Sequence, residues 1–476
     1  MSRYFTTTLP YVNADPHLGH ALEFVQADFL ARAARMRGES VFLNVGTDEH
    51  GAKIARRAAE EGRDPQTYVD EYAARFRTFA DRLDISYDSF IRTTEHHHER
   101  AAQAFWKRCE EAGDIYRATY EVKYCVGCEL EKTDSELVDG RCPLHPNLEL
   151  EVRKEENYYF RFSRYQEALL AHYAAYQDFV VPASRMRELT SFVSAGLKDF
   201  SISRPAEKLA WGVPVPGDQT HVMYVWFDAL VNYLSAIGWP EDEERFAKWW
   251  PATQLAGKDN LRQQTAMWQA MLLSAGLPLS RDIFIHGFIT SGGQKMSKSL
   301  GNVIDPMRIA EAYGVDALRY VLLRHVNPYE DSDLTEESIR EYYTAHLANG
   351  LGNLVARVMK LAEEHLPHPI EITEEDETLD PAYTAALDHF RFNEALDVVF
   401  KLVAEADEFM AAKTPYRGIK SGDAVVREGA RKDIEYLVHR LWNIATHLSP
   451  ALPRTAAAIL SAIRKNQKPE NLFPRV

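Results

Sequence analysis

The sequence predicts a parallel α/β fold followed by a helical C-terminal region. An apolar strand, a helix-like segment and a second apolar strand succeed one another between Tyr4 and Val45, which is the order of a βαβ unit. Two more strand-like segments begin at Leu255 and Ile283, and helical patterns follow Asp305. The chain has 476 residues, of which 46% are hydrophobic and 26% charged, so it can build several domains with ample cores.

The first unit begins with a buried strand from Tyr4 to Leu9, and a helix from His17 to Arg37 follows it. Asp15 is a favoured N-cap residue, and Pro16 suits the first helical position. Gly38 is expected to end the helix, because glycine readily takes the left-handed conformation found there. Apolar residues recur in this helix at helical spacing, namely Leu22, Val25, Phe29, Ala33 and Met36.

A second apolar strand, from Val41 to Val45, leads into the polar motif Gly46-Thr47-Asp48-Glu49-His50-Gly51. Parallel α/β sheets bind ligands at the carboxyl ends of their strands. This motif and His17-Leu18-Gly19-His20 both fall at such ends. The positive end of the helix dipole points toward His17, which suits a phosphate group.

A second nucleotide-handling motif, Lys295-Met296-Ser297-Lys298-Ser299, lies between Gly293 and Gly301. Two imidazoles at a helix start and two ammonium groups on a loop suit a triphosphate, since they neutralise charge as pyrophosphate leaves. We therefore predict a Rossmann-type parallel-sheet nucleotide-binding domain. A helix cap with surface histidines is the alternative interpretation of the histidine motif.

Three cysteines and a histidine predict a metal site. Cys125 and Cys128, then Cys142 and His145, form two corners of Cys-x-x-ligand spacing, which is typical of a tetrahedral Zn²⁺ site. All four positions are ligands, so we predict one structural Zn²⁺ per chain; buried reduced thiols are the alternative. Residues 116–220 are rich in charged and aromatic side chains, and we interpret them as a zinc-bearing insertion between two halves of the nucleotide fold.

The second half of that fold follows the insertion. We expect Val222 to Leu230 to continue the sheet and then turn into a helix. Strand ends are expected at Leu255 to Asn260 and at Ile283 to Phe288, with a helix between them. Side chains from these segments can converge on one pocket, although plain core packing is the alternative: Trp226, Tyr233, Asn260, Gln264 and Trp268.

Composition excludes several classes of protein. The net charge of −15 argues against indiscriminate nucleic-acid binding, while a local basic face can still meet a specific RNA. No run of about 18 apolar residues predicts a membrane span, and no signal-peptide pattern opens the chain, so we expect a cytoplasmic location. Cys109, the fourth cysteine, is expected to be an inert core thiol, and His96-His97-His98 a solvated helix face.

Together these motifs resemble those of the methionyl-tRNA synthetases, a family of class I aminoacyl-tRNA synthetases. The histidine and lysine motifs are typical of class I, and the zinc corners with Tyr11, Trp226 and Trp268 are typical of its methionine enzymes. The resemblance runs from Tyr4 to about residue 450. It includes Pro10 to His20, Gly46 to Gly51, Trp226-Phe-Asp-Ala229 and Gly257-Lys-Asp259.

The resemblance implies that L-methionine attacks the α-phosphate of Mg-ATP, which gives methionyl-adenylate and pyrophosphate, and that the methionyl group then passes to the 3′ end of tRNA(Met). The catalytic residues it implies are His17, His20, Asp48, Arg204, Lys295 and Lys298. The ATP-binding residues it implies are His17, Gly19, His20, Glu23, Gly257, Lys258, Asp259, His286 and Lys298. The amino-acid-binding residues are Leu9, Tyr11, Asp48, Trp226, Ala229, Leu230, Tyr233, Asn260, Gln264 and Trp268.

The resemblance also implies an all-α anticodon-binding domain with Asn353, Arg357 and Tyr416 as its readers. The family usually has tryptophan where Tyr416 stands, and a tyrosine ring can still stack on a base. Asn260 and Gln264 stand where isoleucine and histidine are common in the family. These polar replacements fit either divergence among methionine enzymes or a different amino-acid substrate.

The resemblance divides the chain into five parts: residues 1–115 and 221–300 (the two halves of the catalytic domain), 116–220 (the insertion), 301–341 (a stem-contact linker) and 342–476 (the anticodon-binding domain). We expect a monomer that uses ATP, L-methionine and both initiator and elongator tRNA(Met), with Mg²⁺ bound to ATP and no membrane partner. The alternative is a synthetase-like paralogue that activates an amino acid and transfers it to a non-tRNA acceptor.

Overall fold

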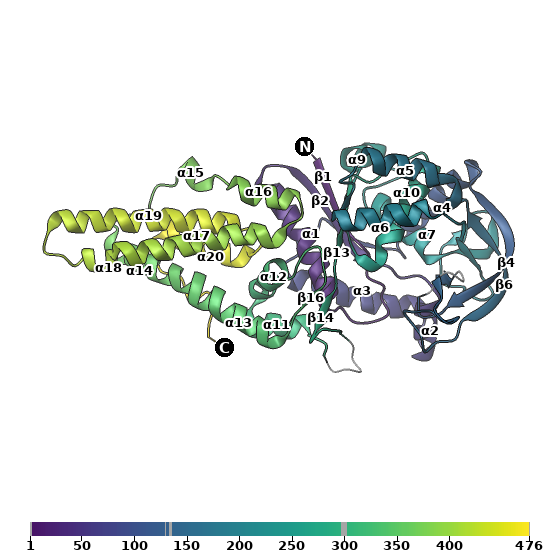
Figure 1. The fold of residues 1–476 in the computed structure, drawn as a ribbon, viewed down its shortest axis with the longest axis horizontal. Helices are drawn as coiled ribbons and strands as arrows, with labels where there is room; N and C mark the ends of the chain where they lie inside the picture. Colours follow the sequence, from purple (N-terminus) through teal and green to yellow (C-terminus); the bar gives the residue numbers. More distant parts are fainter. Residues whose placement is uncertain (1, 129, 133–135, 297–301, 476) are drawn as a thin grey trace. The chain divides into compact units, whose positions relative to one another are not determined.

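The computed structural model describes residues 2–128, 130–132, 136–296 and 302–475, and it forms two compact units (Figure 1). The first, which we call the sheet unit, comprises Met1–Pro16, Phe42–Phe79 and Tyr87–Ile285. The second, which we call the helical unit, comprises His17–Val41, Ala80–Ser86 and His286–Val476. Each unit is therefore assembled from segments that are far apart in the sequence.

A six-stranded sheet, in the order β3-β2-β1-β12-β13-β7, forms the centre of the sheet unit. The pairs β1 with β12, β2 with β3, and β13 with β7 are all parallel, which confirms the predicted fold class. Leu9 lies beyond β1, because the chain leaves the ladder before Pro10, which lacks a backbone donor. The strands are β1 (Ser2–Thr7), β2 (Ser40–Thr47), β3 (Ser89–Arg92), β7 (Val180–Val181), β12 (Thr253–Gly257) and β13 (Asp282–His286).

The expectation that Val222 to Leu230 continues this sheet is wrong. β11 (Asp218–Met223) instead pairs antiparallel with β10 (Pro214–Val215) and with β9 (Ser203–Pro205) in a separate sheet. Gly217, with a φ of 76°, makes the short turn between β10 and β11. Such a turn joins only antiparallel strands, since a parallel pair needs a crossover of about a dozen residues.

A further antiparallel sheet, in the order β5-β4-β6-β8, carries the cysteine corners. Its long pair runs from Ile115 opposite Phe160 to Tyr124 opposite Glu151. β7 also lies within residues 116–220, yet it forms an edge strand of the central sheet. The strands are β4 (Ile115–Cys125), β5 (Leu130–Lys132), β6 (Glu151–Phe160) and β8 (Phe200–Ser201).

The core of the sheet unit is rich in aromatic residues. Phe105 stacks on Trp268 with ring centroids 5.5 Å apart, and its ring meets that of Trp239 edge-on. The helices of this unit are α2 (Ala52–Glu60), α3 (Pro65–Arg82), α4 (His96–Glu111), α5 (Gln166–Ala175), α6 (Ala183–Ser194), α7 (Val225–Ala229), α8 (Asn232–Ser235), α9 (Glu243–Trp249) and α10 (Trp268–Ser274).

The expectation that His96, His97 and His98 form a solvated face is wrong for His98. The side chain of His96 is 91% exposed, whereas that of His98 is fully buried. His98 Nδ1 lies 2.9 Å from Ser235 Oγ. Residues two positions apart in a helix lie on nearly opposite faces, so the run cannot share one environment.

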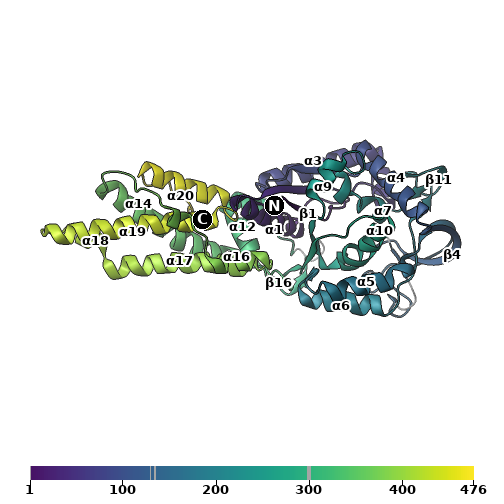
Figure 2. The same ribbon diagram turned by 90° about the horizontal axis from the view of Figure 1, so that it is seen from above.

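The helical unit contains a bundle in which α17, α19 and α20 run side by side (Figures 1 and 2). Three short strands accompany its helices: β14 (Ile289–Ser291), β15 (Gln294–Lys295) and β16 (Ser332–Asp333). The helices are α1 (Leu18–Met36), α11 (Pro306–Tyr313), α12 (Val315–Arg324), α13 (Glu336–Tyr342), the π-helix η6 (Tyr343–Gly352), α14 (Asn353–His365), α15 (Glu374–Glu377), α16 (Pro381–Asp388), α17 (Phe392–Lys413), α18 (Pro415–Gly418), α19 (Ala424–Leu448) and α20 (Pro453–Lys465).

A buried arginine on α12 joins four segments of the helical unit. Arg319 is fully buried and donates from Nη2 to Asp28 Oδ2 on α1 at 2.6 Å. Its other contacts are the backbone oxygens of Ala451 at 2.7 Å, Leu83 at 3.1 Å and Pro450 at 3.1 Å. Burial opposes the charge of Asp28, but Arg319, Arg32 and the hydrogen bonds from Ser86 together outweigh it, so the pKa of this carboxyl group is lowered.

Within the described ranges, none of the helices combines the length and the apolar character that a bilayer crossing requires.

We predict that Arg319→Ala lowers the free energy of unfolding by about 3–5 kcal/mol, because it removes one of the two arginines that pair with the buried Asp28 and also removes the donor to three backbone oxygens. Arg319→Lys should rescue little of this loss, since an ammonium group cannot reach four separate acceptors. The measurement is urea unfolding followed by circular dichroism. Arg454→Ala is the control: this arginine pairs with Asp84 in the same unit but is 61% exposed, so about 1 kcal/mol or less is expected. Equal losses in both variants would contradict the role of Arg319.

Candidate functional site

Asp48 lies directly after β2 and is held by the backbone that follows β1. Asp48 N donates to Pro10 O at 2.9 Å, and Val12 N donates to Asp48 O at 3.2 Å. Tyr11 and Asp48 thus face each other in a parallel bridge. Leu9, Tyr11 and Asp48, all predicted to bind the amino acid, therefore lie together at the carboxyl end of the sheet.

The residue after Asp48 anchors the same loop from inside. Glu49 is fully buried and accepts two hydrogen bonds from Arg92, at 2.7 and 2.9 Å, and one from Thr47 Oγ1 at 2.6 Å. Trp211 Nε1 donates to Glu49 O at 2.6 Å. The sequence analysis did not identify Glu49, Arg92 and Trp211 as residues that support the loop. Only Glu49 could have been found, because it is a charged residue in the motif that follows a buried strand.

His50 connects the Asp48 loop to the segment that carries Trp226. His50 Nδ1 lies 3.1 Å from Asp228 Oδ2, and both side chains are buried. Burial opposes the charge of each group, but the pair prevails: the pKa of His50 is raised and that of Asp228 is lowered. This pair brings α7, with Trp226 and Ala229, beside the loop of Asp48.

The predicted pocket residues Tyr233 and Trp268 lie in the aromatic core. Their ring centroids are 5.9 Å apart at an interplanar angle of 64°, and Leu230 is buried in the same cluster. Trp268 Nε1 is buried without a hydrogen-bond acceptor in the part of the chain that the structure describes. Trp226, by contrast, is partly exposed.

Gln264 belongs to a buried network of amides. It lies in the π-helix η4 (Gln263–Met267), and its Oε1 accepts from Gln254 Nε2 at 3.4 Å. Ser280 Oγ donates to Gln254 Oε1 at 2.5 Å, and Gln269 Nε2 donates to Ser280 Oγ at 3.1 Å. Gln264 therefore finds a protein partner for its amide, as a buried polar group requires.

The other predicted residues after β12 lie in a short turn. Gly257 ends this strand, and Lys258, Asp259 and Asn260 form the 3₁₀-helix η3 (Lys258–Asn260). Asp259 is exposed, whereas Lys258 and Asn260 are partly buried. This turn keeps three predicted ligands at the carboxyl end of the strand.

Arg204 lies on β9 with its guanidinium group packed on an aromatic ring. The side chain is buried, and its Cζ is 4.4 Å from the ring centroid of Tyr224. Nη1 donates to Ser201 Oγ at 2.7 Å and to Ser203 O at 2.6 Å. These contacts hold the charge in one place within the sheet unit.

In the helical unit, the two motif histidines cap α1. His17 Nδ1 accepts from Gly19 N at 3.1 Å, and His20 Nδ1 accepts from His17 N at 3.2 Å. His17, rather than the predicted Asp15, is thus the N-cap, because these reciprocal bonds start the helix there. The rings stack with centroids 3.7 Å apart.

The protonation of these rings follows from the cap. Burial and the neighbouring His17 lower the pKa of His20 well below its ordinary value. An Nδ1 that accepts a hydrogen bond leaves the proton of a neutral ring on Nε2. The histidine motif can therefore cap the helix through Nδ1 and still carry the proton of a neutral ring on Nε2, so the cap does not exclude the proposed ligand role.

Glu23 and His286, two more predicted ATP-binding residues, contact each other. Glu23 lies one turn beyond His20 on α1, and its Oε2 is 3.0 Å from His286 Nε2. His286 Nδ1 is 2.8 Å from Gly287 O. Both side chains are buried, so this pair gives the start of α1 a fixed position within the helical unit.

The lysine motif begins on a hairpin of the helical unit. Lys295 on β15 pairs with Thr290 on β14, across a turn in which Gly292 and Gly293 have φ of 63° and 71°. Gly293 N donates to Asp333 Oδ1 at 2.8 Å, which holds the turn on β16. Lys298 lies outside the described residues, so its predicted role stays a prediction.

The four predicted metal ligands form one cluster. The Sγ atoms of the three cysteines and one ring nitrogen of the histidine all lie within 4.8 Å of one another. Cys128 Sγ is 3.4 Å from Cys142 Sγ and 3.2 Å from His145 Nδ1. Zn–S bonds of about 2.3 Å place tetrahedral ligands about 3.8 Å apart, so the cluster could hold a metal ion of this size. A Cβ on Gly127 would lie 2.4 Å from the His145 ring, so only glycine fits there.

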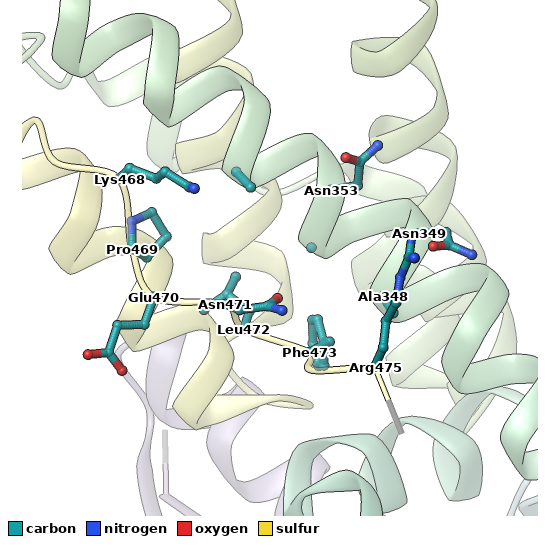
Figure 3. Close-up of a pocket in the computed structure, with 12 residues that line it drawn as sticks. Ala348, Asn349, Asn353, Lys468, Pro469, Glu470, Asn471, Leu472, Phe473 and Arg475 are labelled. Atoms are coloured by element: carbon teal, nitrogen blue, oxygen red, sulfur yellow. The ribbon is translucent and has the colours of Figure 1, made fainter.

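The predicted RNA-binding residues all lie in the helical unit. Asn353 is the first residue of α14, directly after the π-helix η6, and it borders a cavity of about 390 Å³ (Figure 3). Arg357, one turn later, donates from Nη1 to Asp407 on α17 at 2.9 Å. Tyr416 on α18 is 38% exposed, and the Cζ atom of Arg417 lies 5.8 Å from the centroid of its ring.

Comparison with known proteins identifies relatives over nearly the whole chain. A family model described as "tRNA synthetases class I (M)" matches residues 3–149 and 145–359. The methionine–tRNA ligase of Thermosynechococcus vestitus is 41% identical over 480 residues, which cover 96% of this chain and 90% of that protein. The methionine–tRNA ligase of Mesorhizobium japonicum is also 41% identical, over 97% of this chain and 91% of that protein.

Solved structures match as well. The methionyl-tRNA synthetase of Mycobacterium tuberculosis bound by methionyl-adenylate is similar with a TM-score of 0.91 and 36% identity, covering 100% of this chain and 99% of that one. The free state of the Mycobacterium tuberculosis enzyme matches with a TM-score of 0.84 and 33% identity, covering 100% of this chain and 98% of that one.

We predict that Asp228→Asn destabilises the protein more at about pH 6 than at about pH 9. A raised pKa of His50 means that its charged form stabilises the fold fully below the ordinary value of about 6.5, and that this contribution disappears as the pH rises through the raised pKa. The loss at the lower pH should be roughly 1–3 kcal/mol. Urea unfolding at both pH values measures it.

The control is Glu241→Gln, which removes a carboxylate from a surface pair with Arg100 and should change little at either pH. A loss for Asp228→Asn that is the same at both pH values would show that the charge of His50 does not contribute.

Proposed function

The chain belongs to the methionine–tRNA ligase family of class I tRNA synthetases, and from this premise we propose that it activates L-methionine with ATP and transfers the methionyl group to tRNA(Met). In the first step the methionine carboxylate attacks the α-phosphate, and the bond to pyrophosphate breaks. In the second step a hydroxyl of the terminal ribose attacks the activated carbonyl, and AMP leaves. Catalysis is then mostly positioning and stabilisation of charge.

In the proposed mechanism, the sheet unit holds the amino acid. Asp48 accepts hydrogen bonds from the substrate ammonium, and Arg204 supplies a fixed positive charge. Tyr11, Trp226 and the residues of α7 surround the thioether, which is polarisable and packs well on aromatic rings. Shape and dispersion give such a pocket about 1–3 kcal/mol per methylene of discrimination.

The helical unit holds the triphosphate. His17 and His20 donate from Nε2–H to phosphate oxygens as negative charge develops. Glu23 and His286 position the start of α1, while Lys295 and Lys298 neutralise the departing pyrophosphate. Gly19, and in the sheet unit Gly257, Lys258 and Asp259, are proposed nucleotide ligands too. Mg²⁺ enters with ATP as part of the substrate.

Zn²⁺ is the metal we propose for the cysteine cluster, one ion per chain. Cys125, Cys128, Cys142 and His145 would hold it with all four positions filled, so it cross-links the loop and takes no part in the reaction. The support is the donor set and its spacing.

The proposed RNA contacts are Asn353, Arg357 and Tyr416. An amide and a guanidinium suit the base edges of an unpaired loop, and a tyrosine ring suits stacking. The partners include initiator and elongator tRNA(Met). We also propose that the protein acts as a monomer in the cytoplasm and that its five-part division corresponds to the family's domains.

Methionine as the substrate is supported by the similarity to methionine–tRNA ligases over nearly the whole chain. The His50–Asp228 pair adds that α7, which carries Trp226, is held beside the Asp48 loop. The partner that Gln264 finds in Gln254 also explains a polar residue there without a polar substrate. The paralogue alternative therefore loses part of its support.

The deciding experiment is charging of a tRNA(Met) transcript with methionine and ATP, beside a transcript with an altered CAU anticodon. Charging that depends on CAU is the expected result. Pyrophosphate exchange with methionine in the absence of any charging would favour the paralogue instead.

We predict that Lys298→Ala slows methionyl-adenylate formation by about 10²–10³-fold, because one charge-stabilising donor is lost in the transition state. Pyrophosphate exchange measures this rate, and filter binding of tRNA(Met) should change little. The matched control is Lys107→Ala, which removes an exposed charge from α4. If exchange in Lys298→Ala stays within a few-fold of the control, the assignment of the lysine motif is wrong.

A further inference from the structure

The residues after α20, Asn466 to Arg475, form a segment that we call the tail. It packs along the continuous helix formed by η6 and α14, which we call the helix in this subsection. Asn466 Nδ2 donates to Ala362 O at 3.3 Å and to Leu366 O at 3.0 Å, which caps the end of α14. Lys468 N donates to Glu363 Oε2 at 3.3 Å. The backbone of the tail is thus held at its beginning.

The other end of the tail is held by aromatic residues. Phe473 is 4% exposed, and its ring contacts that of Tyr343 edge-on at 6.1 Å. Tyr343 Oη donates to Pro474 O at 2.6 Å. A Cβ on Gly352 would lie 3.1 Å from Phe473 Cδ2, so this glycine allows the close approach. The tail is therefore held against the helix at both of its ends.

Between the tail and the helix lies the cavity of about 390 Å³ that Asn353 borders (Figure 3). Asn349 and Asn353 lie one turn apart on the helix, while Lys468, Asn471 and Arg475 line the cavity from the tail. Figure 3 shows Lys468 extending toward the helix and Glu470 pointing away from it. Ligand sites commonly have volumes of roughly 300–1,000 Å³.

Five polar side chains of this cavity have no protein partner among the residues that the structure describes. The side chains of Asn349, Asn353 and Asn471 make no hydrogen bond to any residue that the structure describes, and those of Lys468 and Arg475 make no ion pair within the same ranges. All five side chains are exposed. The cavity thus offers two cations and three amides for hydrogen bonding, and its one lining carboxylate among the described residues, that of Glu470, points away from the helix.

We propose that the tail and the helix together bind one unpaired nucleotide of the tRNA anticodon loop, next to the bases read by Asn353 and Arg357. The proposal rests on the proposed function. Amide groups pair with base edges, whereas lysine and arginine contact the phosphates on either side of a base. Lys468, Asn471 and Arg475 then become tRNA-binding residues that no motif in the sequence identified.

The test uses the double variant Lys468→Ala/Arg475→Ala in the full chain, with tRNA(Met) binding measured over a series of salt concentrations. Loss of two phosphate contacts should weaken binding about tenfold at low salt and reduce the slope of log K against log salt by about 1.4. Asn471→Ala, which removes a base contact, should raise the KM for tRNA by about five- to a hundredfold at every salt concentration.

The matched control is Lys401→Ala/Arg340→Ala. These residues are 77% and 61% exposed in the same unit but lie outside the cavity, and the change in net charge is identical. Pyrophosphate exchange, which needs no RNA, reports for each variant whether the catalytic machinery is intact. Equal weakening in the control, or a parallel fall in exchange, would overturn the proposal.

Variants of the helix separate this proposal from the function it rests on. If Asn353→Ala and Arg357→Ala impair charging while the tail variants behave as the unsubstituted protein, the tail proposal fails and the anticodon assignment stands. If helix and tail variants all charge normally and charging ignores the CAU sequence, the anticodon assignment itself fails.

Discussion

The buried ion pair between Arg319 and Asp28 is the constraint around which the helical unit is organised. Asp28 lies in the middle of α1, whose first turn carries His17 and His20. Arg319 reaches it from α12 and also binds the backbone at Leu83, Pro450 and Ala451. A buried charge is tolerated only when its hydrogen bonds are satisfied, so this cluster requires all four segments to be in place. The start of α1, where we propose that the triphosphate binds, therefore depends for its position on residues far along the chain, since Arg319 lies 291 positions after Asp28.

The sheet unit also contains buried ion pairs, and they lie near Asp48. Glu49 with Arg92, and His50 with Asp228, are buried pairs on either side of the loop that starts at Asp48. Buried ion pairs add little net stability compared with apolar packing, but breaking one is costly. In this loop they define a single backbone path. The proposed role of Asp48 needs such a path, because its carboxylate would then meet the substrate ammonium without reorganisation.

The sequence predicted the parallel sheet, the helical region and the residues of the metal cluster, because these depend on local patterns. Its predictions were wrong where the structure of a segment depends on the segment that packs against it. Val222 to Leu230 has the apolar character of a buried strand, yet its first two residues end β11, which the turn at Gly217 pairs antiparallel with β10, and most of the remainder forms α7. His98 belongs to a polar run, yet helical geometry turns it into the core. Asp15 is a good N-cap residue, yet the paired imidazole bonds begin the helix at His17.

By itself, the sequence determined the chemistry of this protein: which imidazoles, carboxylates, lysines and thiols are present, and at what spacing along a strand end or a helix start. Such spacings translate directly into local geometry because helices and strands have fixed periods. Only the tertiary structure decided which of these groups have partners. Gln264 is satisfied by Gln254, while the amides of Asn349, Asn353 and Asn471 are left unused among the described residues beside a tail that returns over a hundred residues later. Contacts between distant segments depend on how complete elements pack, and no local pattern in the chain encodes that packing.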